Sequence, residues 1–81
     1  MDRSEAQTAV EEAITRVVPG ADLTHLDPDA AFRDALEFDS LDFLSFVEIL
    51  SERTGLRTDE EDHPRLTTLN DSIDFLVART P

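Results

Sequence analysis

Apolar residues recur every three or four positions along three stretches of the chain, and this interval predicts amphipathic α-helices. The first stretch begins with Ser4-Glu5-Ala6-Gln7, which has the spacing of a capping box, and Pro19-Gly20 should end the helix. The apolar face of this helix consists of Ala6, Val10, Ala13, Ile14 and Val17.

The second stretch extends from about Ser40 to Arg53 and stops at Gly55, because glycine closes helices without backbone strain. The third is expected to start at Thr68, whose hydroxyl can cap a helix. Its apolar stripe consists of Leu69, Ile73 and Leu76. Between these helices, residues 60–64 (Glu-Glu-Asp-His-Pro) are predicted to form one helical turn before the proline.

The segment from Ala21 to Asp39 lacks a helical period and is long for a loop in a small domain. We expect Asp27-Pro28 to start a short helical turn inside it. Apolar side chains are nevertheless spread along the segment, which predicts a loop that packs through its own side chains. They are Leu23, Leu26, Phe32, Leu36 and Phe38.

Together these elements predict an all-α fold. It is a small bundle of three main helices plus a possible short fourth, with a long loop between the first two helices. No stretch alternates apolar and polar residues for long enough to favour a strand. Because the chain has 81 residues, we expect one domain covering 1–81.

Acidic residues dominate the composition: nineteen Asp and Glu stand against seven Arg and no Lys, for a net charge of −12. Phosphate backbones repel such a surface, so nucleic acid is a poor partner. The charge fits either of two roles, keeping the protein dissolved or attracting proteins with basic patches.

The chain has no cysteine and no apolar run near the length of a membrane span, so disulfides, thiolate metal sites and membrane spans are not expected. Its first residues lack the basic and apolar segments of a signal peptide. We therefore expect a soluble, cytoplasmic protein, and a monomer.

The second predicted helix has two different faces. Its core face should consist of Phe43, Phe46, Val47 and Leu50, with Leu44 and Ile49 on the flanks. Its opposite face consists of Asp42, Ser45, Glu48 and Glu52, with Leu41 among them. A single exposed leucine is common on protein surfaces and needs no function. The alternative is that Leu41 is an apolar anchor for a partner, surrounded by charges.

Ser40 lies where this helix starts, and two interpretations are open. Asp39 can cap the helix with Asp42 answering it three residues later, which leaves Ser40 an ordinary residue of the first turn. Alternatively, the free amides and the dipole of the helix start favour a phosphodiester esterified to Ser40.

The tetrapeptide Asp39-Ser40-Leu41-Asp42 follows Phe32-Arg33-Asp34-Ala35-Leu36 and opens an apolar helix that stops at Gly55. This region resembles the phosphopantetheine attachment region of acyl carrier proteins. The similarity extends over nearly the whole chain, including its length, acidity, long loop, and the acidic stretch from Thr58 to Asp62 that leads to the last helix.

The resemblance implies a discrete acyl carrier protein, which is not an enzyme. Ser40 would receive 4'-phosphopantetheine from coenzyme A through a Mg-dependent phosphopantetheinyl transferase. The arm would hold an acyl or aminoacyl group as a thioester and present it to synthases, ligases or acyl-transferring enzymes with basic docking patches. The resemblance also implies partner contacts at Asp39, Leu41, Asp42, Leu44 and Glu52, and Glu48 belongs to the same face.

The chain departs from the family pattern at two positions. Glu37 stands where the family often has glycine, which leaves the loop conformation open, and Glu48 stands where many members have an apolar partner contact. Peptidyl carrier domains are the second candidate, although their Gly-Gly before the serine is missing here. A candidate from another class is an acidic helical adaptor that binds a basic partner without modification.

Other chemistries find less support in the sequence. Ser40 lacks the flanking glycines of a hydrolase nucleophile, and His25 and His63, the only histidines, have no spacing that would make either a base. The run Asp59-Glu60-Glu61-Asp62 lacks the alternating ligands and the glycine of a calcium loop, so no metal site is expected. The pathway, whether fatty acid, polyketide or aminoacyl, stays open. Because Phe43 and Phe46 fill the predicted core face, we expect a short, polar or aminoacyl cargo, or a longer chain that stays outside.

Overall fold

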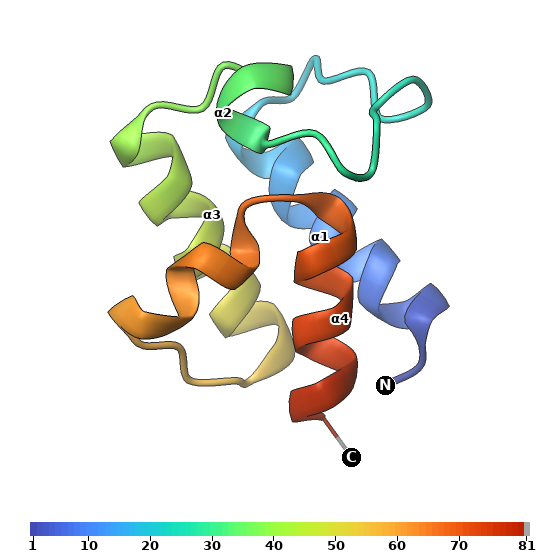
Figure 1. Cartoon of the computed structure of the whole chain (residues 1–81), viewed down its shortest axis with the longest axis vertical. Coiled ribbons are helices and arrows are strands. Elements are labelled where there is room, and N and C mark those ends of the chain that lie inside the picture. Colours follow the sequence, from blue (N-terminus) through green and yellow to red (C-terminus); the bar gives the residue numbers. More distant parts are fainter. Residues whose placement is uncertain (81) are drawn as a thin grey trace.

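Every regular element in the computed structural model, which describes residues 1–80, is a helix. In chain order these elements are α1 (Arg3–Val17), α2 (Phe32–Ala35), α3 (Ser40–Thr54), the 3₁₀ helix η1 (Glu60–Leu66) and α4 (Leu69–Arg79). Figure 1 shows α2 and the loop before it at one end of the bundle, while the N-terminus and the end of α4 lie at the opposite end. The predicted all-α class is confirmed.

Helix α1 begins earlier than predicted, because Asp2 and not Ser4 caps it. The Asp2 carboxylate accepts the Glu5 N–H at 2.8 Å, and the Glu5 carboxylate accepts the Asp2 N–H at 3.3 Å. Both Asp2-x-x-Glu5 and Ser4-x-x-Gln7 have the spacing of a capping box. The earlier pair forms one in the structure, and its two carboxylates also interact favourably with the positive end of the helix dipole.

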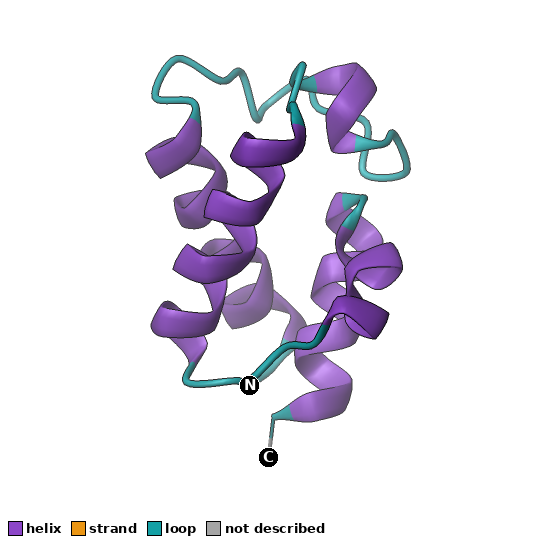
Figure 2. Ribbon diagram, turned by 90° about the vertical axis from the view of Figure 1, so that its left-hand side faces the viewer, coloured by secondary structure: helices purple, strands orange, loops and turns teal. Residues whose placement is uncertain are grey.

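The core lies where α1 contacts α3 and α4, and η1 contacts α4. Figure 2 shows the helices packed along the bundle with connecting loops at its two ends. An ion pair between Glu12 and Arg53 joins α1 to α3 at the surface. The buried apolar side chains are Ala6, Ala9, Val10, Ala13, Ile14, Phe32, Phe38, Phe46, Val47, Leu50, Leu66, Leu69, Ile73, Phe75 and Leu76. Two predicted core residues are only partly buried: Val17 and Phe43. The partial exposure of Phe43 corrects its assignment to the core face.

The short helix in the long loop is α2, at Phe32–Ala35, and not at Asp27-Pro28. At Asp27 the chain instead makes a tight turn: the Ala30 N–H donates to the Asp27 carbonyl at 3.1 Å, and the Asp29 N–H donates to the Asp27 carboxylate at 2.9 Å. Because the aspartate side chain takes up a nearby backbone donor, the turn competes with a helix at this position.

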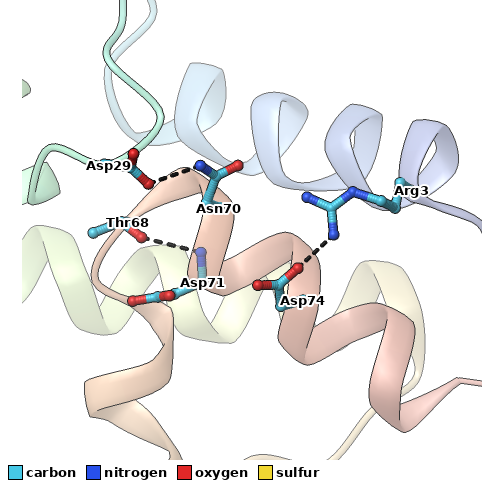
Figure 3. Close-up of polar contacts among 6 residues, drawn as sticks. All are labelled: Arg3, Asp29, Thr68, Asn70, Asp71 and Asp74. Carbon is cyan, nitrogen blue, oxygen red and sulfur yellow. Dashed lines mark hydrogen bonds and ion pairs between the residues drawn. The ribbon is translucent and has the colours of Figure 1, made fainter.

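The long loop is fixed to the start of α4. The Phe32 N–H donates to the Thr67 carbonyl at 2.8 Å. Asn70 bonds the loop twice, through its N–H to the Pro28 carbonyl at 3.0 Å and through Nδ2 to the Asp29 carboxylate at 2.8 Å (Figure 3). The apolar loop residues pack against the core, as predicted: Phe32 and Phe38 are buried, and Leu23, Leu26 and Leu36 are partly buried.

The start of α4 is also the predicted one. The Thr68 hydroxyl accepts the Asp71 N–H at 3.0 Å, and an ion pair between Arg3 and Asp74 joins α1 to α4 on the outer surface (Figure 3). Upstream, η1 continues through Pro64 to Leu66, beyond the single turn predicted to stop at the proline. Leu66 is completely buried, so packing against the core holds this last part of η1 in place.

Candidate functional site

The start of α3 is held by a reciprocal pair of carboxylates. The Asp39 carboxylate accepts the Asp42 N–H at 2.8 Å, and the Asp42 carboxylate accepts the Asp39 N–H at 3.3 Å. The Asp39 carbonyl accepts the Phe43 N–H at 3.0 Å, which is the first bond of the helix. The predicted capping role of Asp39 and Asp42 is therefore confirmed.

Capping by Asp39 leaves Ser40 outside this network. Ser40 is the first residue of α3 and its side chain is exposed. In an α-helix the N–H groups of the first residues have no carbonyl partner within the helix. The capping box uses the Asp42 N–H. The N–H groups of Ser40 and Leu41, the first two residues of the helix, have no carbonyl partner within it. An anion attached to Ser40 would lie at the positive end of the helix dipole.

Glu37 lies in the turn that leads from α2 to α3 and has a positive φ of 56°. The left-handed conformation costs a residue with a side chain about 1–2 kcal/mol, a penalty that glycine avoids. The loop conformation that the sequence left open is therefore the one glycine adopts most easily, here adopted by an exposed glutamate. The carboxylate of Glu37 adds to the negative charge before Ser40.

The exposed face of α3 combines apolar and acidic side chains. Leu41 is 74% exposed and Leu44 is 48% exposed, which makes them the large hydrophobic side chains that residues 1–80 leave open to solvent. Ser45, Glu48 and Glu52 are exposed on the same helix, whereas Ile49 packs against the core. The predicted acidic face with an apolar residue in it is confirmed as a surface.

Phe43 and His63 form a contact that the sequence analysis missed. Their ring centroids are 5.4 Å apart and the rings meet edge to face, so a side chain of α3 packs against one of η1. His25 instead contacts Asp22, with Nδ1 2.7 Å from the carboxylate, and this hydrogen bond lowers the pKa of Asp22. No local pattern predicts the Phe43–His63 pair, because the two residues belong to separate elements.

The acidic run at residues 59–62 is part of the fold. The Asp59 N–H donates to the Asp62 carboxylate at 3.0 Å, and Arg79 of α4 donates to the same carboxylate at 3.1 Å. Within residues 1–80, no group of three or more His, Cys, Asp or Glu side chains is arranged to hold a metal ion. Across the same residues, no helix is long and apolar enough to span a membrane.

The start of α3 thus combines an exposed serine with a cap made by Asp39, on a small acidic helical bundle. Comparisons with known proteins give the family. Residues 9–76 match the model of the phosphopantetheine attachment site.

Relatives match over most of their length. The acyl carrier protein of Rubrobacter xylanophilus is 35% identical over 77 residues, which cover 95% of this chain and 94% of that protein. The acyl carrier protein of Acidothermus cellulolyticus is 28% identical over 80 residues, covering 99% and 94%, respectively. That of Solidesulfovibrio magneticus is 33% identical over 57 residues, covering 70% and 73%.

The chain therefore belongs to the acyl carrier protein family. Members of this family are carriers and not enzymes, and they hold 4'-phosphopantetheine covalently. Family membership favours a carrier over the unmodified acidic adaptor.

Proposed function

We propose that Ser40 is the attachment site of 4'-phosphopantetheine, and that the protein carries an acyl or aminoacyl group on this arm. The observation that carries the proposal is the position of Ser40: exposed, first in α3, and not needed to cap the helix. A serine that capped the helix would lose its capping bond on modification. Here Asp39 makes that bond, so Ser40 can be esterified while the helix start stays intact.

The residues around Ser40 suit a phosphodiester. In the modification, Ser40 Oγ forms a bond to the phosphorus of coenzyme A that bears pantetheine, and the bond from that phosphorus to the bridging oxygen breaks. Adenosine 3',5'-bisphosphate leaves, and the hydroxyl proton passes to a base of the transferase or to solvent. The amides of Ser40 and Leu41 and the positive end of the helix dipole would stabilise the negative charge of the phosphodiester. When bound, the phosphopantetheine group supplies a terminal thiol that holds the cargo as a thioester.

The exposed face of α3 is the proposed docking surface for partner enzymes. Leu41 and Leu44 offer apolar contacts next to Ser40, and Glu48 and Glu52 offer charges farther along the helix. Asp39 and Asp42 add charge at the helix start, although their carboxylates also serve the capping box. Partners with basic patches, the transferase included, would approach this face faster because of long-range attraction. The cytoplasmic location and the monomeric state remain predictions from the sequence.

The experiment is incubation with coenzyme A, Mg²⁺ and a broad-specificity phosphopantetheinyl transferase, followed by intact mass measurement. We expect the wild type to gain the mass of one phosphopantetheine and Ser40→Ala to gain nothing. Ser45→Ala is the matched control, since Ser45 is an exposed serine of the same helix. Modification of Ser40→Ala at the wild-type rate, or no modification of the wild type, would show that the attachment site is assigned wrongly.

A further inference from the structure

Four phenylalanine side chains gather at the end of the bundle where α3 starts. Phe32 of α2 lies 5.6 Å from Phe38 and 5.2 Å from Phe46, measured between ring centroids. Phe38 lies 5.9 Å from Phe46, and Phe43 lies 6.4 Å from Phe46. Phe46 is therefore surrounded by three other rings, which come from α2, from the loop and from its own helix.

These rings fill the interior close to the carrier serine. Phe46 is 0% exposed, Phe32 is 1% exposed and Phe38 is 4% exposed. At these centroid separations the rings are in direct contact. Protein interiors are packed as densely as organic crystals, so a group inserted among these rings must displace them.

Phe43 and His63 form the ring contact that joins α3 to η1, and this contact is called the seam. The Phe43 ring contacts both the Phe46 ring, with centroids 6.4 Å apart, and the His63 ring, with centroids 5.4 Å apart. Phe43 is partly buried and packs against the core that holds the three buried rings. A chain that reached Phe46 through this seam would first have to displace the Phe43 ring.

We infer that the cargo stays outside the helix bundle, and that the natural substrate class is a short or polar acyl or aminoacyl group. This inference rests on the proposed attachment to Ser40. A long alkyl chain in water gains free energy from each methylene that it buries, so it enters a carrier wherever room exists. A short or polar group gains little from burial and needs no cavity. Because the aromatic cluster fills this part of the interior, the bundle suits a short or polar cargo that needs no cavity.

The test loads the protein through the transferase with acetyl-coenzyme A and, separately, with dodecanoyl-coenzyme A. Intact mass first confirms that each arm is attached, so failure of the attachment is seen separately from failure of this inference. We expect the two loaded forms of the wild type to melt within about 2 °C of each other. Burial of only four methylenes would raise the melting temperature of the dodecanoyl form by more than about 10 °C, and such a rise would overturn the inference.

A pair of variants assigns the effect to the seam. Phe43→Ala opens the seam, so its dodecanoyl form should melt several degrees above its acetyl form. Val77→Ala trims a partly buried apolar side chain of α4 that is not part of the aromatic cluster, and should show no such difference. If the two loaded forms of Phe43→Ala melt together as well, the packing of the aromatic rings is not what keeps the chain outside, and the argument for this cargo class is overturned.

A second measurement does not depend on the stability of any variant. In the wild type loaded with a ¹³C-labelled dodecanoyl chain, we expect no nuclear Overhauser effect between the chain and the rings of Phe32 or Phe46. Contacts of the chain with these rings would contradict the inference whatever the melting temperatures show.

Discussion

Two segments of this chain share the spacing Asp-x-x-Asp at the start of a helix, yet only one forms the proposed functional site. In 39–42 the aspartates enclose Ser-Leu and start the 15-residue helix α3, and both enclosed side chains are exposed. In 59–62 they enclose Glu-Glu and start the 7-residue 3₁₀ helix η1. The spacing alone therefore specifies a helix start, and the enclosed residues decide what that start offers to a partner.

The second aspartate also meets different surroundings in the two segments. Asp42 bonds back to the backbone of Asp39 and is half-buried. Asp62 is buried and is bonded by both the Asp59 N–H and Arg79 of α4. The second segment thus connects two helices of the fold, while the first leaves Ser40 and Leu41 exposed at the helix start.

The largest expected effect is a difference in stability between variants on the buried and the exposed side of α3. Phe46→Ala removes a fully buried ring and should lower the free energy of unfolding by about 3–5 kcal/mol. Leu41→Ala removes a side chain that is 74% exposed and should change it by less than about 0.5 kcal/mol. Urea unfolding followed by circular dichroism measures both. An equal loss of unfolding free energy in the two variants would mean that Leu41 contributes to the packing of the fold and is not an exposed contact for a partner.

A charge reversal tests which acidic segment partners approach. Glu48→Lys on α3 should slow modification by the transferase several-fold at low salt, because it reverses a charge on the proposed docking surface. Glu60→Lys makes the same change of net charge in the exposed part of 59–62 and should slow it less. Initial rates should converge as salt rises, since the Debye length is only about 10 Å at 0.1 M ionic strength. Equal rates for both variants at low salt would mean that the acidic face of α3 does not guide the approach of the transferase and serves only solubility.

The smallest effect concerns the structural segment and its dependence on pH. The hydrogen bond from the Asp59 N–H and the charge of Arg79 hold the pKa of Asp62 below its usual range, despite burial, which acts in the opposite direction. A carboxyl whose pKa is lowered in the folded state stabilises the fold fully above its ordinary pKa of about 3.9. This contribution is lost as the pH falls through the lowered value.

Arg79→Gln should therefore be less stable than the wild type at neutral pH, and the difference should shrink as the pH falls below about 3.9. The exposed Arg57 supplies a matched control, Arg57→Gln, which removes one charge without touching Asp62. Thermal melts between pH 2.5 and pH 7 compare the three proteins. A difference between Arg79→Gln and the wild type that is independent of pH would show that the ion pair does not carry the effect.

The sequence predicted most of the fold because local signals determine most helix ends. Gly55 adopts a positive φ of 73° after α3, and Thr68 caps α4. The predicted start of α1 was wrong by two residues because two overlapping capping boxes fit the same pattern. The exposed face of α3 followed directly from its helical period.

What the sequence could not predict depends on contacts between distant segments. Helix α2 forms at Phe32–Ala35, where Phe32 is held by Thr67 and buried beside Phe46, and nothing local favours this position over Asp27-Pro28. The partial burial of Phe43 depends on His63, which reaches it from η1. The ion pair between Asp62 and Arg79 likewise depends on how α4 packs against η1.

The most direct test of the central claim is localisation of the arm within the modified wild-type protein. Cleavage after Arg33 and Arg53 releases a peptide, residues 34–53, that contains the serines Ser40, Ser45 and Ser51. After modification with coenzyme A and transferase, fragmentation of this peptide should place the whole mass of the phosphopantetheine on Ser40. Finding that mass on Ser45, on Ser51 or on another peptide would contradict the account of Ser40 as the carrier serine.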